Sequence, residues 1–238
     1  MANSEHIVAS FDRDLEGIQA QIMRMGGLVE DAISKSTQAL DMRDVELARE
    51  VRQGDKAIDD LEEMVNDEAA RIIAQRQPAA TDLRTVLTVF RVSTNLERIG
   101  DYAKNIAKRT ETIIDQPPVN GTGASLRRMA RQVELMLKDV LDAYIQRDAD
   151  LAADVRARDM DVDQMYSALF REYLTFMMED PRNITTCMHL HFMAKNIERM
   201  GDHVTSIAEQ VIYLVTGDLP DEERPKQDRT PHDAGATK

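Results

Sequence analysis

Apolar residues recur at steps of three and four along nearly the whole chain, which is the period of an amphipathic α-helix. No segment alternates convincingly between apolar and polar positions, so the pattern gives no strand signal. Proline, glycine or a capping aspartate interrupts the pattern at five places along the chain. We therefore predict six long helices, at residues 5–40, 44–77, 81–115, 124–145, 148–179 and 183–216.

The second half of the chain repeats the first. Residues 25–59 align with 129–163 without a gap and share twelve identical positions. The heptapeptide N-L-E-R-I-G-D at 95–101 returns as N-I-E-R-M-G-D at 196–202. We predict an all-α fold of two tandem, pseudo-symmetric three-helix bundles at residues 1–116 and 124–216. They are joined by a linker at 117–123 and followed by a charged, disordered tail at 217–238.

The third and sixth predicted helices carry matching apolar stripes with alternating steps of three and four. Such a seam is expected where long antiparallel helices pack at a shallow angle, so we predict that its members are core. The members are Val89, Val92, Leu96, Ile99, Ala103 and Ile106, with Leu190, Met193, Ile197, Met200, Val204, Ile207, Val211 and Leu214 in the copy.

The composition of the chain indicates which kinds of partner it can bind. The formal net charge is −13, which disfavours nucleic acid and direct docking on anionic lipid, and suits cations or a partner with a basic patch. A single cysteine, Cys187, excludes an internal disulfide and is typical of a reducing compartment. There is no signal-peptide pattern and no apolar run long enough to span a bilayer. We expect a cytoplasmic protein without direct membrane insertion.

Within each heptapeptide two carboxylates lie four residues apart on one helix face, as Glu97 and Asp101 do in the first copy. Like charges at this spacing cost roughly 0.2–0.5 kcal/mol. The mid-helix glycine, Gly100, adds about 1 kcal/mol relative to alanine. An isolated helix gains nothing from this combination, so its repetition indicates a tertiary or functional cause.

Short connections make successive helices antiparallel. The height of each residue along the bundle axis then follows from its distance in sequence to the nearest turn. This arithmetic places Asp59 level with Gly100, and Asp55 level with Lys104. The second half repeats the arrangement, with Asp163 level with Gly201. We predict one carboxylate-lined metal site per bundle, with the ligands Asp55, Asp59, Glu97 and Asp101 in the first and Asp159, Asp163, Glu198 and Asp202 in the second. Glu30 and Glu134 are weaker candidates at the same heights.

Carboxylate oxygens suit Mg²⁺, Ca²⁺, Mn²⁺ or iron, so metal ions of this kind are the expected cofactor. The alternative is that the acidic faces are merely solvated. Glu68 and Glu172 also match across the repeat, and either extend a site or pair with a base. The sequence contains no Gly-rich phosphate loop, nucleophile–base arrangement or dinucleotide motif, which argues against an enzyme. The alternative function is a metal-dependent hydrolase or redox enzyme using the same carboxylates.

The doubled heptapeptide, each copy preceded by V-R-x-x-D-x-x-[IV]-D at 51–59 and 155–163, resembles the PhoU family of phosphate-signalling proteins. The resemblance spans roughly residues 5–216. It implies paired three-helix bundles, often dimeric, in which the E(D)-x-x-x-D motifs bind metal clusters, commonly of iron. It also implies a negative regulator of phosphate uptake and of the phosphate-starvation response. The implied partners are the ATPase subunit of a phosphate ABC transporter and a membrane sensor histidine kinase, and the implied assembly is a homodimer.

Overall fold

The computed structural model describes residues 2–119 and 121–220, and this part of the chain is all-helical, as predicted. Six long helices are present, and the fifth is interrupted. The third helix ends two residues earlier and the fourth begins two residues earlier than predicted. The elements are α1 (Ala2–Met42), α2 (Val45–Arg76), α3 (Thr81–Ile113), α4 (Thr122–Gln146), α5 (Ala149–Ala157), α6 (Asp159–Glu179), a 3₁₀ turn (Pro181–Asn183) and α7 (Ile184–Thr216).

The repeated Arg-Asp pair forms the first turn of each half. Arg43 and Arg147 adopt left-handed backbone conformations, with φ of 55° and 53°, and end the preceding helix. Asp44 and Asp148 then cap the next helix by accepting from the amide three residues later, at 3.0 and 2.9 Å. The same Arg-Asp dipeptide therefore produces the same turn between two helices in both halves.

The fifth helix, predicted to be continuous over 148–179, is interrupted at Arg158, where α5 ends and α6 begins. The Arg158 guanidinium lies 2.6 Å from Asp139 Oδ2 on α4 and 3.1 Å from Asp154 Oδ2 on α5. The corresponding residue in the unbroken α2 is Gly54, which has no side chain to make such contacts. The two ion pairs therefore hold the chain at the break, one residue before the predicted ligand Asp159.

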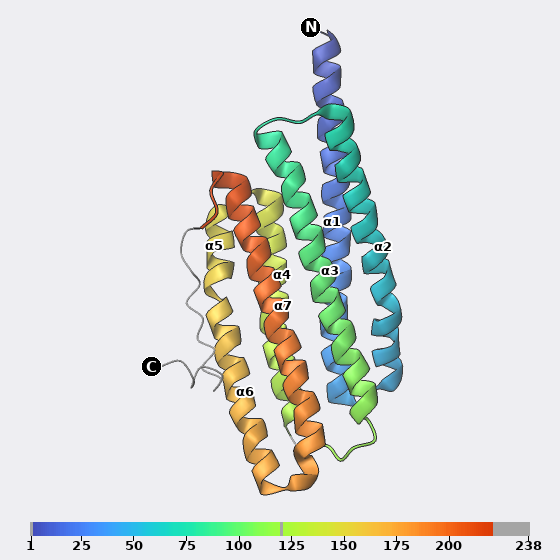
Figure 1. Cartoon of the computed structure of the whole chain (residues 1–238), viewed down its shortest axis with the longest axis vertical. Coiled ribbons are helices and arrows are strands. Elements are labelled where there is room, and N and C mark those ends of the chain that lie inside the picture. Colours follow the sequence, from blue (N-terminus) through green and yellow to red (C-terminus); the bar gives the residue numbers. More distant parts are fainter. Residues whose placement is uncertain (1, 120, 221–238) are drawn as a thin grey trace, which may run out of the picture.

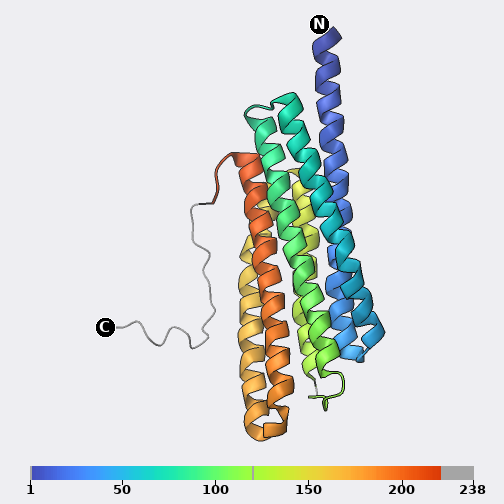
Figure 2. The same ribbon diagram turned by 45° about the vertical axis from the view of Figure 1, so that its right-hand side comes forward.

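The two halves lie side by side, with α3 against α7 and α1 against α4 (Figure 1). Every predicted residue of the two apolar seams is buried, so the seam prediction is confirmed. Most buried apolar residues of both halves form one continuous cluster, and a smaller second cluster contains Ala39, Ala48, Val51 and Ala107. In the view of Figure 2, the first turns of α1 extend beyond the ends of the other helices.

Within residues 2–119 and 121–220, no helix is both long and apolar enough to cross a membrane. Most of the tail that we predicted to be disordered, residues 221–238, lies outside the described residues. Residues Gly217–Pro220, which precede it, follow the end of α7.

Two candidate metal centres

The first acidic cluster joins α2 to α3 through a lysine. Asp55 of α2 is 5% exposed, and Lys104 of α3 donates to its Oδ2. The same ammonium lies 3.3 Å from Asp101 Oδ1. The predicted level pair, Asp55 and Lys104, is therefore in direct contact. An intramolecular cation lies between two of the carboxylates that we assigned to a metal ion.

Asp59 lies next to this group but is exposed to solvent. Partial burial raises the pKa of Asp59, and so does the negative charge of Asp55, while Lys104 acts in the opposite direction. The charges of Asp101 and Glu62 also raise it. The predicted ligands Asp55, Asp59 and Asp101 are thus brought within electrostatic reach of one another.

Among the carboxylates of the first cluster, Glu97 has the most strongly raised pKa. Burial raises the pKa of Glu97 to about 7, with further contributions from Asp101 and Glu62, and Arg98 opposes the shift. Glu62 was missed by the sequence analysis, although it continues the stripe of Asp55 and Asp59 by one helical step. The first cluster therefore contains five carboxylates, one more than predicted.

The second acidic cluster lines a cavity of about 390 Å³ between α3, α6 and α7. Asp163 and Glu198 are 7% and 6% exposed, so both are more deeply buried than their counterparts Asp59 and Glu97. Tyr102, which belongs to the first half, forms part of the wall. The lining residues are Tyr102, Asp163, Lys195, Glu198, Arg199, Asp202 and His203.

Glu198 is the carboxylate whose surroundings most favour an additional cation. Its Oε1 lies 2.7 Å from Lys195 Nζ, whereas its Oε2 is buried and has no hydrogen-bond partner among the described residues. Burial raises the pKa of Glu198; Lys195 opposes this, and Asp202 and Asp163 add to it. A buried carboxylate oxygen without a partner is uncommon in native structures and fits an additional positive ligand.

The carboxylates repeat between the two clusters, but the lysines do not. Lys104 corresponds to Thr205 in the second half, and Lys195 corresponds to Thr94 in the first. Thr205 donates to the carbonyl of Gly201 at 2.8 Å and so cannot replace an ammonium group. The two clusters are therefore electrostatically different, although their acidic residues match.

The recurring mid-helix glycine is explained by close packing between helices. A Cβ at Gly100 would lie 3.0 Å from Ile58 Cδ1 on α2. A Cβ at Gly201 would lie 3.3 Å from Asp159 Oδ1 and 3.4 Å from Val162 Cγ1 on α6. The glycine lets the helix that carries the aspartate pair, α2 or α6, pack closely against the helix that carries the heptapeptide, α3 or α7.

The two weaker candidates lie at another interface, where α1 meets α4. The pKa of Glu30 is raised by burial first, with Lys138 acting against this and Glu134 adding to it. Glu134 pairs with Arg131 at 2.8 Å on its own helix. The charges that shift the pKa of Glu30 thus come from α4 and not from the first acidic cluster. Of the two unexplained glutamates, Glu68 pairs with Arg71 on α2.

In this arrangement, no three histidine, cysteine or acidic side chains among the described residues converge as a ready metal site. The donor set still suits a hard cation, because it offers carboxylate oxygens and no thiolate. In the second cluster Asp163, Glu198 and Asp202 would hold the ion. In the first, Asp101 and Asp55 would have to exchange Lys104 for it.

Fold and site define a duplicated all-α protein whose paired acidic clusters are suited to binding. The PhoU domain model matches residues 22–110 and 126–211, so the chain belongs to the PhoU family. A Rhizobium meliloti relative, named phosphate-specific transport system accessory protein PhoU homolog, is 44% identical over 94% of this chain and 95% of its own length.

Solved structures of the family have the same fold. The crystal structure of PhoU from Pseudomonas aeruginosa has a TM-score of 0.84 and 39% identity, covering 87% of this chain and all of that one. The phosphate transport system regulatory protein PhoU from Streptococcus pneumoniae has a TM-score of 0.82 and 29% identity, covering 89% of this chain and all of that one. The predicted family and fold class are confirmed.

Proposed function

We propose that this chain is a regulatory accessory protein of phosphate transport, which restrains phosphate uptake and the phosphate-starvation response. The support is family membership over both halves, together with relatives that carry the accessory-protein name and match it nearly end to end. Burial raises the pKa of the single thiol, Cys187, which disfavours a thiolate nucleophile at neutral pH. We therefore propose that the chain acts by binding other molecules rather than by catalysing a reaction.

The partners in this proposal are the ATPase subunit of a phosphate ABC transporter and a membrane sensor histidine kinase, contacted by a homodimer in the cytoplasm. The net charge of −13 favours partners that offer basic surfaces. Deleting the chain should activate a phosphate-starvation reporter in phosphate-rich medium. Co-purification from crosslinked cells should recover both partners. If the reporter stays silent in the deletion strain, the regulatory role is wrong.

Each acidic cluster is proposed to bind a divalent or ferric ion. The observation that carries this proposal is the buried Oε2 of Glu198, which lies in the same cavity as Asp163 and Asp202 and has no hydrogen-bond partner in the described part of the chain. Such an ion would neutralise carboxylates that otherwise repel one another and would tie α6 to α7.

Metal content of protein purified without chelator tests the sites. We expect Asp163→Ala to lose the second ion, whereas Asp161→Ala, an exposed position on the same helix, keeps it. Asp59→Ala and its exposed neighbour Asp60→Ala form the matched pair in the first half. Equal metal content in all four variants would favour the solvated-face alternative. Turnover of a phosphoester or peroxide by the metal-loaded protein would favour the hydrolase or redox alternative.

A further inference from the structure

A groove between α1 and α4 is lined by three arginines, in a chain whose net charge is −13. It has a volume of about 500 Å³ and lies away from both acidic clusters. Hydroxyl groups face it from α1 and guanidinium groups from α4. The lining residues are Ser34, Thr37, Asp41, Ala124, Arg127, Arg128, Arg131 and Glu134.

Three arginines stand on one face of α4 within five residues, a spacing at which like charges repel. Arg127 lies 3.3 Å from Asp41 Oδ2, and Arg131 lies 2.8 Å from Glu134 Oε2. Arg128 has a neutral partner instead, donating to Ser125 Oγ at 2.7 Å. Three positive and two negative groups leave the groove with a formal charge of +1, in a chain of −13.

The guanidinium groups are accessible to a ligand from solvent. The side chains of Arg127 and Arg131 are 54% and 67% exposed. Ser34 on the opposite wall is also exposed, and its hydroxyl can donate to an anion. The groove thus presents donors from two helices without any rearrangement of the backbone.

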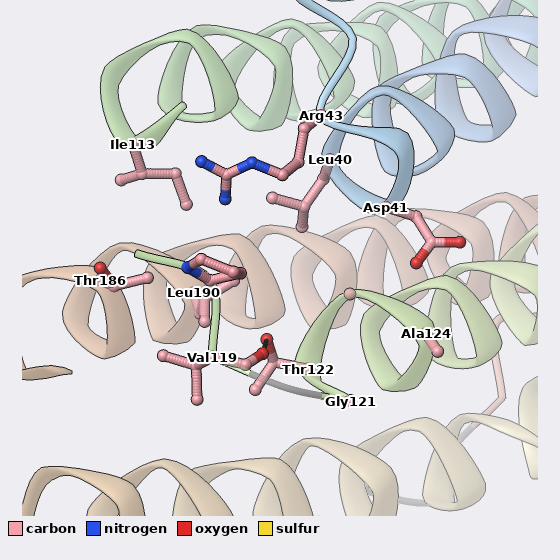
Figure 3. A pocket seen from close by; sticks show the side chains of 12 residues that line it. Leu40, Asp41, Arg43, Ile113, Val119, Gly121, Thr122, Ala124, Thr186 and Leu190 are labelled. Carbon is pink, nitrogen blue, oxygen red and sulfur yellow. Dashed lines mark hydrogen bonds between the residues drawn. The ribbon is translucent and has the colours of Figure 1, made fainter. Parts of the chain in front are cut away.

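The nearby start of α4 adds positive character. Its N-cap is Gly121, so no side chain caps the first turn, and that turn contains no acidic residue. Figure 3 shows the adjoining cavity, of about 240 Å³, with Asp41 beside Ala124 at its edge. Asp41 is the only acidic residue lining both cavities within the described part of the chain.

The internal repeat does not impose this cluster. Arg127 and Arg131 correspond to Met23 and Gly27 in the first half, although Arg128 matches an arginine there. Met23 is half-buried and Gly27 is exposed. The two extra arginines are therefore a feature of the second half alone.

We propose that this groove binds a phosphate oxyanion, either free or as the monoester of a small molecule. Guanidinium forks pair with such oxygens through two parallel hydrogen bonds. Among the described residues, Arg128 donates to the neutral hydroxyl of Ser125 and pairs with no carboxylate that a ligand would have to displace. The hydroxyl of Ser34 supplies a donor from the opposite side. This site is separate from the proposed metal centres and does not depend on them.

Isothermal titration of the full chain with orthophosphate, in chelator so that the acidic clusters hold no metal, tests the site. We expect saturable binding that weakens about tenfold or more in Arg128→Gln, because a charge-assisted hydrogen bond is lost. Arg128→Lys keeps the charge but loses the fork, and should fall between the two. Arg49→Gln, which removes an exposed arginine paired with Glu46 on α2, is the matched control and should bind like the parent chain.

A parallel titration with glycerol phosphate distinguishes the two sources of the ligand. Tighter binding of the ester assigns the site to a phosphorylated small molecule, and tighter binding of orthophosphate assigns it to the free ion. The proposal is overturned if neither compound saturates the parent chain at millimolar concentration. It is also overturned if a folded Arg128→Gln, checked by circular dichroism, binds as well as the parent chain.

Discussion

Replacing Gly100 with alanine tests why a glycine recurs in the middle of both motif helices. The new Cβ would lie 3.0 Å from Ile58 Cδ1 and 3.4 Å from its Cγ2. Ile58 is 2% exposed, so it has little room to move. The helix gains about 1 kcal/mol from the substitution, whereas overpacking a core costs about 1–3 kcal/mol. We expect a net loss of about 1 kcal/mol in the free energy of unfolding.

The matched control is Gly54→Ala on α2, where an added Cβ meets no atom within 4 Å. That variant should gain the helix term alone, about 1 kcal/mol. The two variants then differ by about 2 kcal/mol, which separates their Tm values by about 4–8 °C in a protein of this size. Thermal unfolding followed by circular dichroism in chelator measures the difference. Equal stabilisation of both variants would refute the packing explanation for the doubled glycine.

Three further predictions test other parts of the structure. Gly26→Ala would overlap with Leu141 Cδ1 on α4 and should lower stability by about 1–3 kcal/mol, whereas Gly27→Ala meets nothing within 4 Å and should not. Asp148→Ala removes an N-cap and should cost about 1 kcal/mol in the free energy of unfolding, measured in urea. The folded pKa of Glu97, about 7, lies above its ordinary 4.5, so its ionisation lowers stability as pH rises through this window. Glu97→Gln should therefore stabilise the chain by about 1 kcal/mol near pH 8, after discounting for solvent screening, and not at all near pH 4.5, as urea unfolding in chelator would show.

The helices and the heights of the acidic residues could be predicted from the sequence because both follow from simple periods. Apolar steps of three and four located the seams, and short turns fixed which residues lie level. Asp55 and Lys104 were predicted to lie at the same height, and in the structure they are in direct contact. The interruption at Arg158 was not predicted, because the apolar pattern continues through it and its ion pairs are tertiary.

Rotation about each helix axis could not be predicted, and this limited the site. Glu30 and Glu134 have suitable heights but lie at the α1–α4 interface, where the charge of Glu134 raises the pKa of Glu30. Tyr102, which corresponds to His203 in the repeat, was not predicted to line a site, yet it lines the second cavity because α3 packs against α7. Burial also differs between halves in a way the matched motifs hide, with Asp163 buried and Asp59 exposed. Packing between the halves, rather than pattern within each, decides these features.

The lysines occupy different positions in the two acidic clusters, so the two halves of this duplicated chain are not equivalent. If Lys104 and Lys195 occupied matching places, the halves would present interchangeable faces, and a binding protein could dock in either of two orientations. With threonine at each corresponding position, the positive and negative charges follow a different order along α3 and α7. A partner that recognised this order of charges would distinguish one half of the chain from the other.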